Sequence, residues 1–532
     1  MRSLADRIRR VPIAGLAVLL LFPLGVLVVY GSNTPSEHTA PLSSALPVVA
    51  AVSQAAPLPV VSRPLRLLKV DPVKGYAGDS FTVTGDGFAP EARVEFFWST
   101  VDSTYLTKTF ADNVEYHERK YAEKRVRLGS AVGDARGRVT AVLVAPEDYG
   151  EVHDLYAVVE GQEVARGGFR ILRSATITPT DGPVGTPITI TVKGLGWRGF
   201  EQFMAVRYDN KYTGEISAVT TRGTAVFQIR AAGPPGTRII QLNNSTAYVP
   251  GAYLNTQQSP QAYIYAHLDN KQEFRFEFSV TRDGGPAPDT LQWPDSERVA
   301  RLDSDAPRTT MAGAKASSGF GTLTPASGPI LSHTTVRAGG LPPNTGVGLF
   351  LVTARGNRMS PSGWNLDSIQ LSKAKTTESG SLTATIQIPD DLGGWHMVKL
   401  AASDRVLLEI PYYVEQSLVS VKPKRVRAGE TFTVQIKGVG WTELDNTVAV
   451  TYDNAVMGYA CGFNSNGDVT INLVASGHPG THLIDLYPAI YRGKDRVPWN
   501  YQTPFLTFAR DFPALALGYR LPAYRLAIEV IK

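Results

Sequence analysis

Short segments in which polar and apolar residues alternate recur along most of the chain. A period of two in residues rich in Thr, Val and Ile predicts β-strands that bury one face. Turn-forming pairs such as Asp181-Gly182 and Asn466-Gly467 separate the segments, and this density of short strands is typical of an immunoglobulin-like β-sandwich. The clearest segments are SFTVTG (80–85), RVTAVLVA (138–145), PITITVKG (187–194), SLTATIQI (381–388), TFTVQIKG (431–438) and DVTINLVA (468–475).

The second half of the chain repeats the first. Residues 175–245 align without a gap to residues 419–489, and TVKGLGW, AVRYDN and GPPGTRIIQL match QIKGVGW, AVTYDN and GHPGTHLIDL at a constant offset of 244. A weaker repeat relates the segments that precede these, and in it His153 corresponds to His396, 243 residues later. A match of this length indicates that one pair of domains, A followed by B, was duplicated.

We therefore expect an all-β chain of four tandem immunoglobulin-like β-sandwich domains, in two A–B pairs, after an N-terminal transmembrane helix. Residues 116–127, with the charged sequence YHERKYAEKRVR, are expected to form a short helix or an extended hairpin. The predicted parts are a signal-anchor or transmembrane segment (1–31), a Pro/Ala/Ser-rich stalk (32–62), domain A1 (63–173), domain B1 (174–282), a flexible linker rich in Asp, Pro, Ser and Gly (283–319), domain A2 (320–415) and domain B2 (416–532).

The opening of each domain resembles that of IPT/TIG-type immunoglobulin-like domains. The motif is a Pro/Gly turn, a Thr/Ile-rich strand and then Gly-x-Gly-aromatic, as in ITPTDGPVGTPITITVKGLGW (177–197) and VSVKPKRVRAGETFTVQIKGVGW (419–441). VDPVKGYAGDSFTVTGDGF (70–88) is similar, and LTPASGPILSHTTVRAGGL (323–341) is the most degenerate. The resemblance implies the fold but no ligand. The aromatic residue of the motif, Trp197 or Trp441, is expected to plug the end of its own domain's core.

The N-terminus predicts export. Four arginines within residues 1–10 precede residues 11–30, which carry no charge and are long enough to cross a bilayer as a helix. This charge asymmetry predicts that everything after residue 31 lies outside the membrane. The alternative is a cleaved signal peptide, which would leave a secreted protein. Residues 32–62 are rich in Pro, Ala and Ser and predict an extended stalk.

Composition narrows the class of protein. The 53 basic and 48 acidic residues give a net charge of +5, which is too dilute to indicate nucleic-acid binding. The chain has one cysteine, Cys461, so no disulfide bond can form within the chain to stabilise the domains. We expect Cys461 to be a small buried hydrophobe, because its neighbours offer no base that would activate it.

Repeated polar groups are the candidates for chemistry. Tyr208-Asp209-Asn210 and Tyr452-Asp453-Asn454 fit a turn after a strand, or a site where an exposed Tyr stacks on a sugar ring beside Asp and Asn. Asp148 and Asp391 fit a polar turn, with calcium binding or acid–base catalysis as the alternative reading. The pair of histidines at positions 478 and 482 is not repeated in the earlier copy, so a zinc site is not expected.

No sequence motif of a known catalytic site is present, so we expect neither an enzyme nor a cofactor. The preferred hypothesis is a cell-surface scaffold or adhesion protein that binds the membrane through its N-terminal helix and meets an envelope, matrix-protein or glycan ligand outside it. The alternative is a carbohydrate-binding accessory protein of envelope or polysaccharide processing. Exposed tryptophans aligned on one face would favour that alternative; the candidates are Trp98, Trp364, Trp395 and Trp499.

Overall fold

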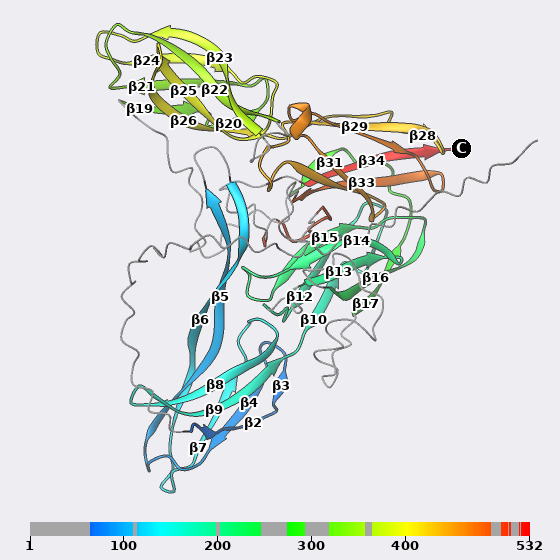
Figure 1. Ribbon diagram of the computed structural model, residues 1–532. Helices are drawn as coiled ribbons and strands as arrows, with labels where there is room; N and C mark the ends of the chain where they lie inside the picture. The colour runs from blue at the N-terminus through cyan, green and yellow to red at the C-terminus, as the bar shows by residue number, and fades with distance from the viewer. Residues whose placement is uncertain are drawn as a thin grey trace, which may run out of the picture. The chain divides into compact units, whose positions relative to one another are not determined.

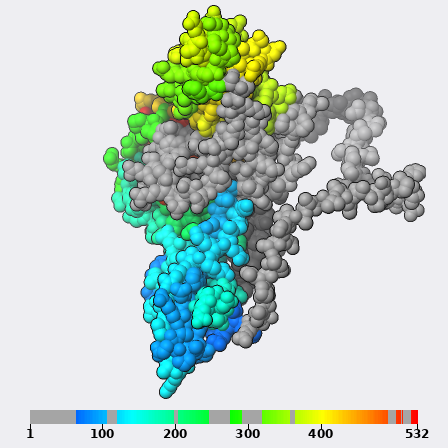
Figure 2. All heavy atoms as spheres, turned by 90° about the vertical axis from the view of Figure 1, so that its left-hand side faces the viewer, coloured from blue at the N-terminus to red at the C-terminus, as the bar shows by residue number. Residues whose placement is uncertain are grey.

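The residues that the structure describes form four β-sandwiches (Figure 1). The computed structural model describes residues 64–109, 114–197, 203–245, 274–292, 319–356, 364–490, 502–508, 510–511, 521 and 523–532. All others are drawn in grey in Figures 1 and 2. Pro64–Lys532 form one compact unit. Each sandwich pairs a three-stranded sheet with a larger one.

Domain A1 has two sheets whose strands are largely antiparallel. The small sheet holds β2 (Lys69–Asp71), β4 (Ser80–Gly85) and β7 (Val139–Val144) in that order. The large sheet runs β1 (Arg66–Leu67), β9 (Gln162–Ile171), β8 (Glu151–Val159), β5 (Arg93–Thr109) and β6 (Val114–Val132), and β3 (Lys74–Gly75) pairs in parallel with β9. Figure 1 shows that β5 and β6 continue well beyond the other strands of their sheet. Residues 116–127 therefore belong to an extended hairpin and not to a helix.

Domain B1 repeats this order of strands. Its small sheet holds β10 (Ser174–Thr178), β12 (Pro187–Lys193) and β15 (Ala225–Arg230). Its large sheet runs β11 (Asp181–Gly182), β17 (Phe274–Val280), β16 (Gly236–Ser245), β13 (Phe203–Tyr208) and β14 (Lys211–Ser217).

Domain A2 has the same topology. Its small sheet holds β19 (Phe320–Thr324), β21 (His333–Gly339) and β24 (Leu382–Gln387). Its large sheet runs β20 (Ser327–Pro329), β26 (Arg405–Glu415), β25 (Gly394–Ala402), β22 (Gly346–Gly356) and β23 (Trp364–Lys375).

Domain B2 completes the series. Its small sheet holds β27 (Ser417–Lys422), β29 (Thr431–Lys437) and β32 (Val469–Val474). Its large sheet runs β18 (Thr290–Gln292), β34 (Ala523–Ile531), β33 (Gly480–Ala489), β30 (Thr447–Tyr452) and β31 (Ala455–Cys461), with β28 (Arg425–Arg427) parallel to β34. A 3₁₀ turn, η1 (Phe463–Ser465), follows β31.

The predicted alternation holds in the small sheets. In β7 every second residue is buried, starting with Val139, and β12 buries Ile188, Ile190 and Val192. All four domains also share a bulge between the last two strands in the order of the large sheet, for example between β13 and β14, and a cis peptide bond before a proline near the start. For the residues that the structure describes, the expectation of an all-β fold with four tandem sandwich-like domains is confirmed.

The predicted linker is partly structured. Thr290–Gln292 form the edge strand β18 of domain B2, antiparallel to β34. Asp289 lies 2.6 Å from the Lys424 ammonium group, and Asp283 accepts a 2.9 Å hydrogen bond from the Thr481 amide. Asp283, Asp289 and Thr290–Gln292 therefore contact domain B2. The flexible linker over residues 283–319 stays a prediction.

Within the part of the chain that the structure describes, no helix is long and apolar enough to cross a bilayer. The predicted anchor (residues 11–30) and the stalk lie outside the described residues.

Candidate functional site

In both halves of the chain, one loop of domain A makes the same contact with domain B. The loop lies between β7 and β8 in A1 and between β24 and β25 in A2. In the first copy Gly150 N–H donates to Leu195 O at 3.0 Å, and Lys193 Nζ donates to Glu147 at 2.8 Å. In the second copy Gly393 N–H donates to Val439 O at 3.0 Å, and Lys437 Nζ donates to Asp390. We call this contact the A–B clasp: residues 147–150 against 193–195, and residues 390–393 against 437–439.

The clasp requires glycine at its centre. A Cβ atom on Gly150 would lie 1.9 Å from Gly194 O, and one on Gly393 would lie 1.7 Å from Gly438 O. Both distances are far below van der Waals contact, so a side chain here would force the loop off the strand of domain B. The repeated Gly in PEDYG and PDDLG therefore reflects this close approach between the domains.

Asp148 and His153 shape the loop in the first copy. The buried carboxylate of Asp148 accepts hydrogen bonds from Trp98 Nε1 at 2.9 Å, Thr100 Oγ1 at 2.8 Å and the Tyr149 amide at 2.8 Å. The two ring nitrogens of His153 lie 2.8 Å from Ser99 O and 2.7 Å from Tyr149 O. These contacts fit the polar-turn reading of Asp148, and they are all internal to the chain.

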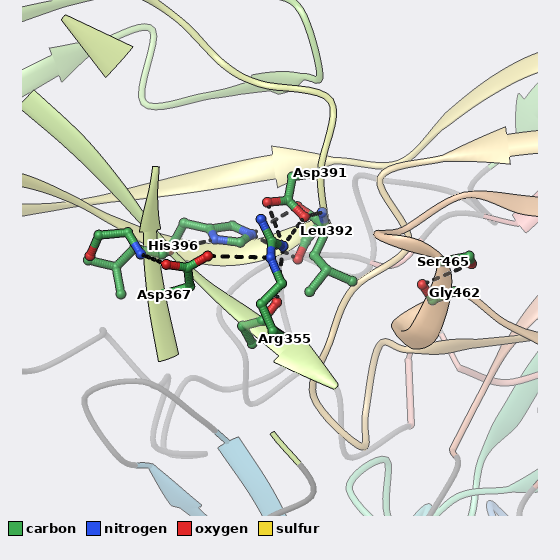
Figure 3. Close-up of polar contacts among 11 residues, drawn as sticks. Arg355, Asp367, Asp391, Leu392, His396, Gly462 and Ser465 are labelled. Atoms are coloured by element: carbon green, nitrogen blue, oxygen red, sulfur yellow. Dashed lines mark hydrogen bonds and ion pairs between the residues drawn. The ribbon is translucent and has the colours of Figure 1, made fainter. Parts of the chain in front are cut away.

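The second copy builds the same loop with an ion pair. Arg355 Nη1 donates to both carboxylate oxygens of Asp391, at 2.8 and 2.9 Å, and its Nε lies 3.5 Å from Asp367 (Figure 3). His396 is buried, with ring nitrogens 2.9 Å from Val352 O and 2.9 Å from Leu392 O. Burial lowers the pKa of His396 below its ordinary value. Arg355 thus replaces the neutral donors Trp98 and Thr100 of the first copy.

Trp197 and Trp441 belong to the B domains, but their side chains contact the neighbouring A domain. The Trp441 ring is 5.6 Å from that of Trp364, packs with Leu392, and donates from Nε1 to Trp395 O at 3.1 Å. The Trp197 ring lies 5.0 Å from that of Tyr121 on the long hairpin of A1. The prediction that these tryptophans plug their own cores is therefore wrong, because each extends past the end of its sandwich into the A–B junction.

The Tyr-Asp-Asn groups form equivalent turns after β13 and β30. Tyr208 and Tyr452 are 2% and 8% exposed, and their hydroxyls donate to Ala232 O at 2.9 Å and Ser476 O at 2.8 Å. Asp209 and Asp453 each accept a 2.9 Å hydrogen bond from a backbone amide of the neighbouring strand in the sheet, β16 or β33. Asn210 is exposed, whereas Asn454 is buried and donates to Arg230 O at 2.8 Å. These contacts are those of a turn; a ligand site at these six residues remains a prediction.

Domains B1 and B2 meet through a buried charge network. Arg230 of B1 donates to Asp485 and to Leu526 O of B2, the latter at 2.7 Å. The other carboxylate oxygen of Asp485 lies 3.0 Å from Arg525, which also donates to the Tyr487 hydroxyl at 2.5 Å. The side chains of Arg230, Asp485 and Arg525 are 6%, 2% and 7% exposed.

A segment of B2 also covers the edge of B1. Glu215 N–H donates to Pro504 O and Leu506 N–H donates to Glu215 O, both at 2.9 Å. Asp511 accepts hydrogen bonds from the Ser217 hydroxyl at 2.6 Å and the Val219 amide at 2.7 Å. The apolar side chains of the segment join the core of B1; they are Phe505, Leu506 and Phe508.

The sequence contained a signal for this interface. Strand β33 is buried on both faces: Ile484 and Leu486 enter the core of B2, while Leu483 and Tyr487 pack with the core of B1. A continuous apolar run indicates burial on both faces of a strand. Residues 486–490, LYPAI, form such a run, whereas their counterpart at 242–246, LNNST, does not.

The remaining candidates are one cysteine, four tryptophans and two histidines. Cys461 is exposed, so the expectation of a buried cysteine is wrong. Trp98 is fully buried and Trp364 and Trp395 are half-buried, while Trp499 falls outside the described residues. His478 and His482 are in ring contact at 4.8 Å, but within the described ranges no three side chains are grouped to hold a metal ion.

No family model and no curated protein matches this sequence. Among solved structures, the chain is similar to invasin, a bacterial integrin-binding protein, with 12% identity, 79% of this chain and 76% of the other covered, and a TM-score of 0.18. The ICAM-5 D1–D4 ectodomain fragment gives 11% identity, 87% and 99% coverage and a TM-score of 0.19. The D0–D1 domain of intimin gives 16% identity, 31% and 89% coverage and a TM-score of 0.12. Similarity at this level carries no argument about ligands.

Proposed function

We propose that the protein is a non-enzymatic cell-surface scaffold or adhesion protein, tethered by its N-terminal segment, that presents four immunoglobulin-like domains of IPT/TIG type outside the membrane. The observation that supports this most directly is the A–B clasp. The same backbone hydrogen bond, the same ion pair and the same glycine occur in both halves. Duplication has thus preserved the contact that joins the domains.

The repeated polar side chains support the same proposal. Asp148, Asp391, His153 and His396, the best candidates for acid–base chemistry, are buried and bonded to groups of their own domain. A general acid or base must reach a substrate proton within hydrogen-bond distance. Their use in shaping the clasp fits a structural role better than a catalytic one.

The test uses intact cells that express the full chain. Cells with the natural chain should adhere to surfaces coated with matrix protein or envelope glycan, and protease added outside should remove both the domains and the adhesion. Gly393→Ala, which breaks one clasp, should reduce adhesion, whereas Gly346→Ala should not, because no atom lies within 4 Å of a Cβ at Gly346. Domains that resist external protease while cells remain intact would refute the topology. A glycan array with the full chain decides between matrix-protein adhesion and the carbohydrate-binding alternative.

A further inference from the structure

The two B domains differ in one cation at an otherwise equivalent turn. Arg238 of B1 and His482 of B2 occupy matching positions in the 244-residue repeat. A guanidinium stays charged at all physiological pH values, whereas an imidazole titrates near neutrality.

In B1, Arg238 ties the turn at Asp209 to the loop before its own strand. Its Nη1 donates to Asp209 Oδ2 at 3.2 Å and its Nη2 donates to Pro234 O. The other oxygen of Asp209 accepts the amide hydrogen of Ile239 at 2.9 Å. Gly233 leaves room for the guanidinium, because a Cβ there would lie 3.2 Å from Arg238 Cζ.

In B2, His482 makes the same two contacts with its ring. Nδ1 lies 2.5 Å from Asp453 Oδ2, and Nε2 lies 2.7 Å from His478 O. The other oxygen of Asp453 accepts the amide hydrogen of Leu483 at 2.9 Å. Gly477, the counterpart of Gly233, lies against the ring, since a Cβ there would be 2.5 Å from His482 Cε1.

Both ring nitrogens of His482 thus face oxygen acceptors. A neutral imidazole has one N–H, while the imidazolium has two, so both contacts are hydrogen bonds only in the charged form. Burial opposes the charge, but the hydrogen bond to Asp453 and the charge of that carboxylate outweigh it, and the pKa of His482 lies above its ordinary value. Besides Asp453, the titratable groups that face His482 are Tyr452, whose ring stacks on the imidazole at 5.4 Å, His478, whose ring lies 4.8 Å away, and Asp283.

The turn that His482 holds also carries contacts to B1. Asn454, next to Asp453, donates to Arg230 O across the interface at 2.8 Å. Thr481, next to His482, donates its amide hydrogen to Asp283, which follows the last strand of B1, at 2.9 Å. Loosening the Asp453 turn would therefore weaken the B1–B2 contact as well.

We propose that His482 is a proton-dependent latch, which holds the Tyr452–Asn454 turn against B1 when it is charged and releases the turn when it loses its proton. Since folding raises its pKa, the stabilisation is complete below the unfolded value of about 6.5. It is lost as pH rises through the higher folded value. Domain B1, held by Arg238, has no such dependence.

The test is hydrogen exchange on the full chain from about pH 5 to about pH 9, a range that spans the titration of a histidine. Protection factors, corrected for the intrinsic pH dependence of exchange, are compared for the equivalent amides of Leu483 and Ile239. Leu483 should lose protection by up to about tenfold per pH unit within the titration window, the limit for release of one proton. Ile239 should show no such loss.

Two reciprocal variants control the experiment. His482→Arg should make Leu483 protection independent of pH, and Arg238→His should give Ile239 the dependence that Leu483 has in the natural chain. Equal pH dependence of the two amides in the natural chain, or a dependence that survives His482→Arg, would overturn the latch. If Leu483 responds but the Thr481 amide does not, the coupling to B1 is wrong. Because Arg238→His changes only domain B1, it tests the chemistry even if His482→Arg fails to fold.

Discussion

The buried carboxylate of Asp485 offers the sharpest test of the B1–B2 interface. Asp485 is 2% exposed and lies between the guanidinium groups of Arg230 and Arg525. Asp485→Ala would leave two buried cations without their counter-charge. Removing one partner of a buried ion pair typically costs about 3–5 kcal/mol. We expect a loss in this range, because each arginine keeps only neutral acceptors, Leu526 O for Arg230 and the Tyr487 hydroxyl for Arg525.

The assay is urea unfolding of the full chain, with hydrogen exchange in β33 and β34 to assign the affected transition, since a multidomain chain need not unfold in one step. The control is Asp86→Ala, which removes the partner of Arg138 from a pair that is also close, at 2.7 Å, but 63% and 71% exposed. Surface pairs contribute little, so this variant should unfold like the natural chain. Replacing Arg230, Asp485 and Arg525 together by apolar residues of similar volume should recover much of the lost stability. If Asp485→Ala unfolds at the same urea concentration as Asp86→Ala, the network is not buried between the domains.

Three further results are expected. Gly393→Ala should speed hydrogen exchange of residues 391–397 and 437–441 and cost at least about 1 kcal/mol, the value of the lost hydrogen bond to Val439, with Gly346→Ala as the unaffected control. Trp441→Ala should cost about 3–5 kcal/mol, and the increased exchange should fall around Leu392 in A2; an increase confined to the core strands of B2 would restore the plug interpretation. Protease added to intact cells should remove domains A1 to B2, and recovery of the intact chain in the cytosol would contradict the predicted export.

Local sequence patterns predicted the fold because they determine which face of each strand is apolar. Alternation in PITITVKG and SLTATIQI gives each strand one apolar face, and two sheets packed face to face bury such faces without helices. The 244-residue repeat then predicted that B1 and B2 share one structure. Both expectations depend on residues close together in the chain or on direct comparison of two segments.

Local patterns can show that a strand is buried on both faces, but they do not show which residues of another domain it contacts. Trp441 follows a strand of B2, and its position gives no sign that its ring lies on Leu392 of A2. Thr290–Gln292 have the composition of a linker, yet they pair with a strand more than 200 residues later in the chain. The pairing partner of a short strand is set by three-dimensional proximity, because three residues have too little pattern to specify it.

The two copies of one edge strand show how a contact between domains changes the burial of equivalent residues. Strand β14 of B1 and strand β31 of B2 are equivalent, but the segment that begins at Pro504 covers only β14 among the described residues. Ser217 is consequently 1% exposed and bonded to Asp511, whereas its counterpart Cys461 is exposed. A Cβ on Gly214 would meet Pro504 O at 2.6 Å, while one on Gly458 would meet nothing within 4 Å. The burial expected for Cys461 is thus the burial that its repeat partner has, and the difference arises from a segment of B2 that docks on the other domain.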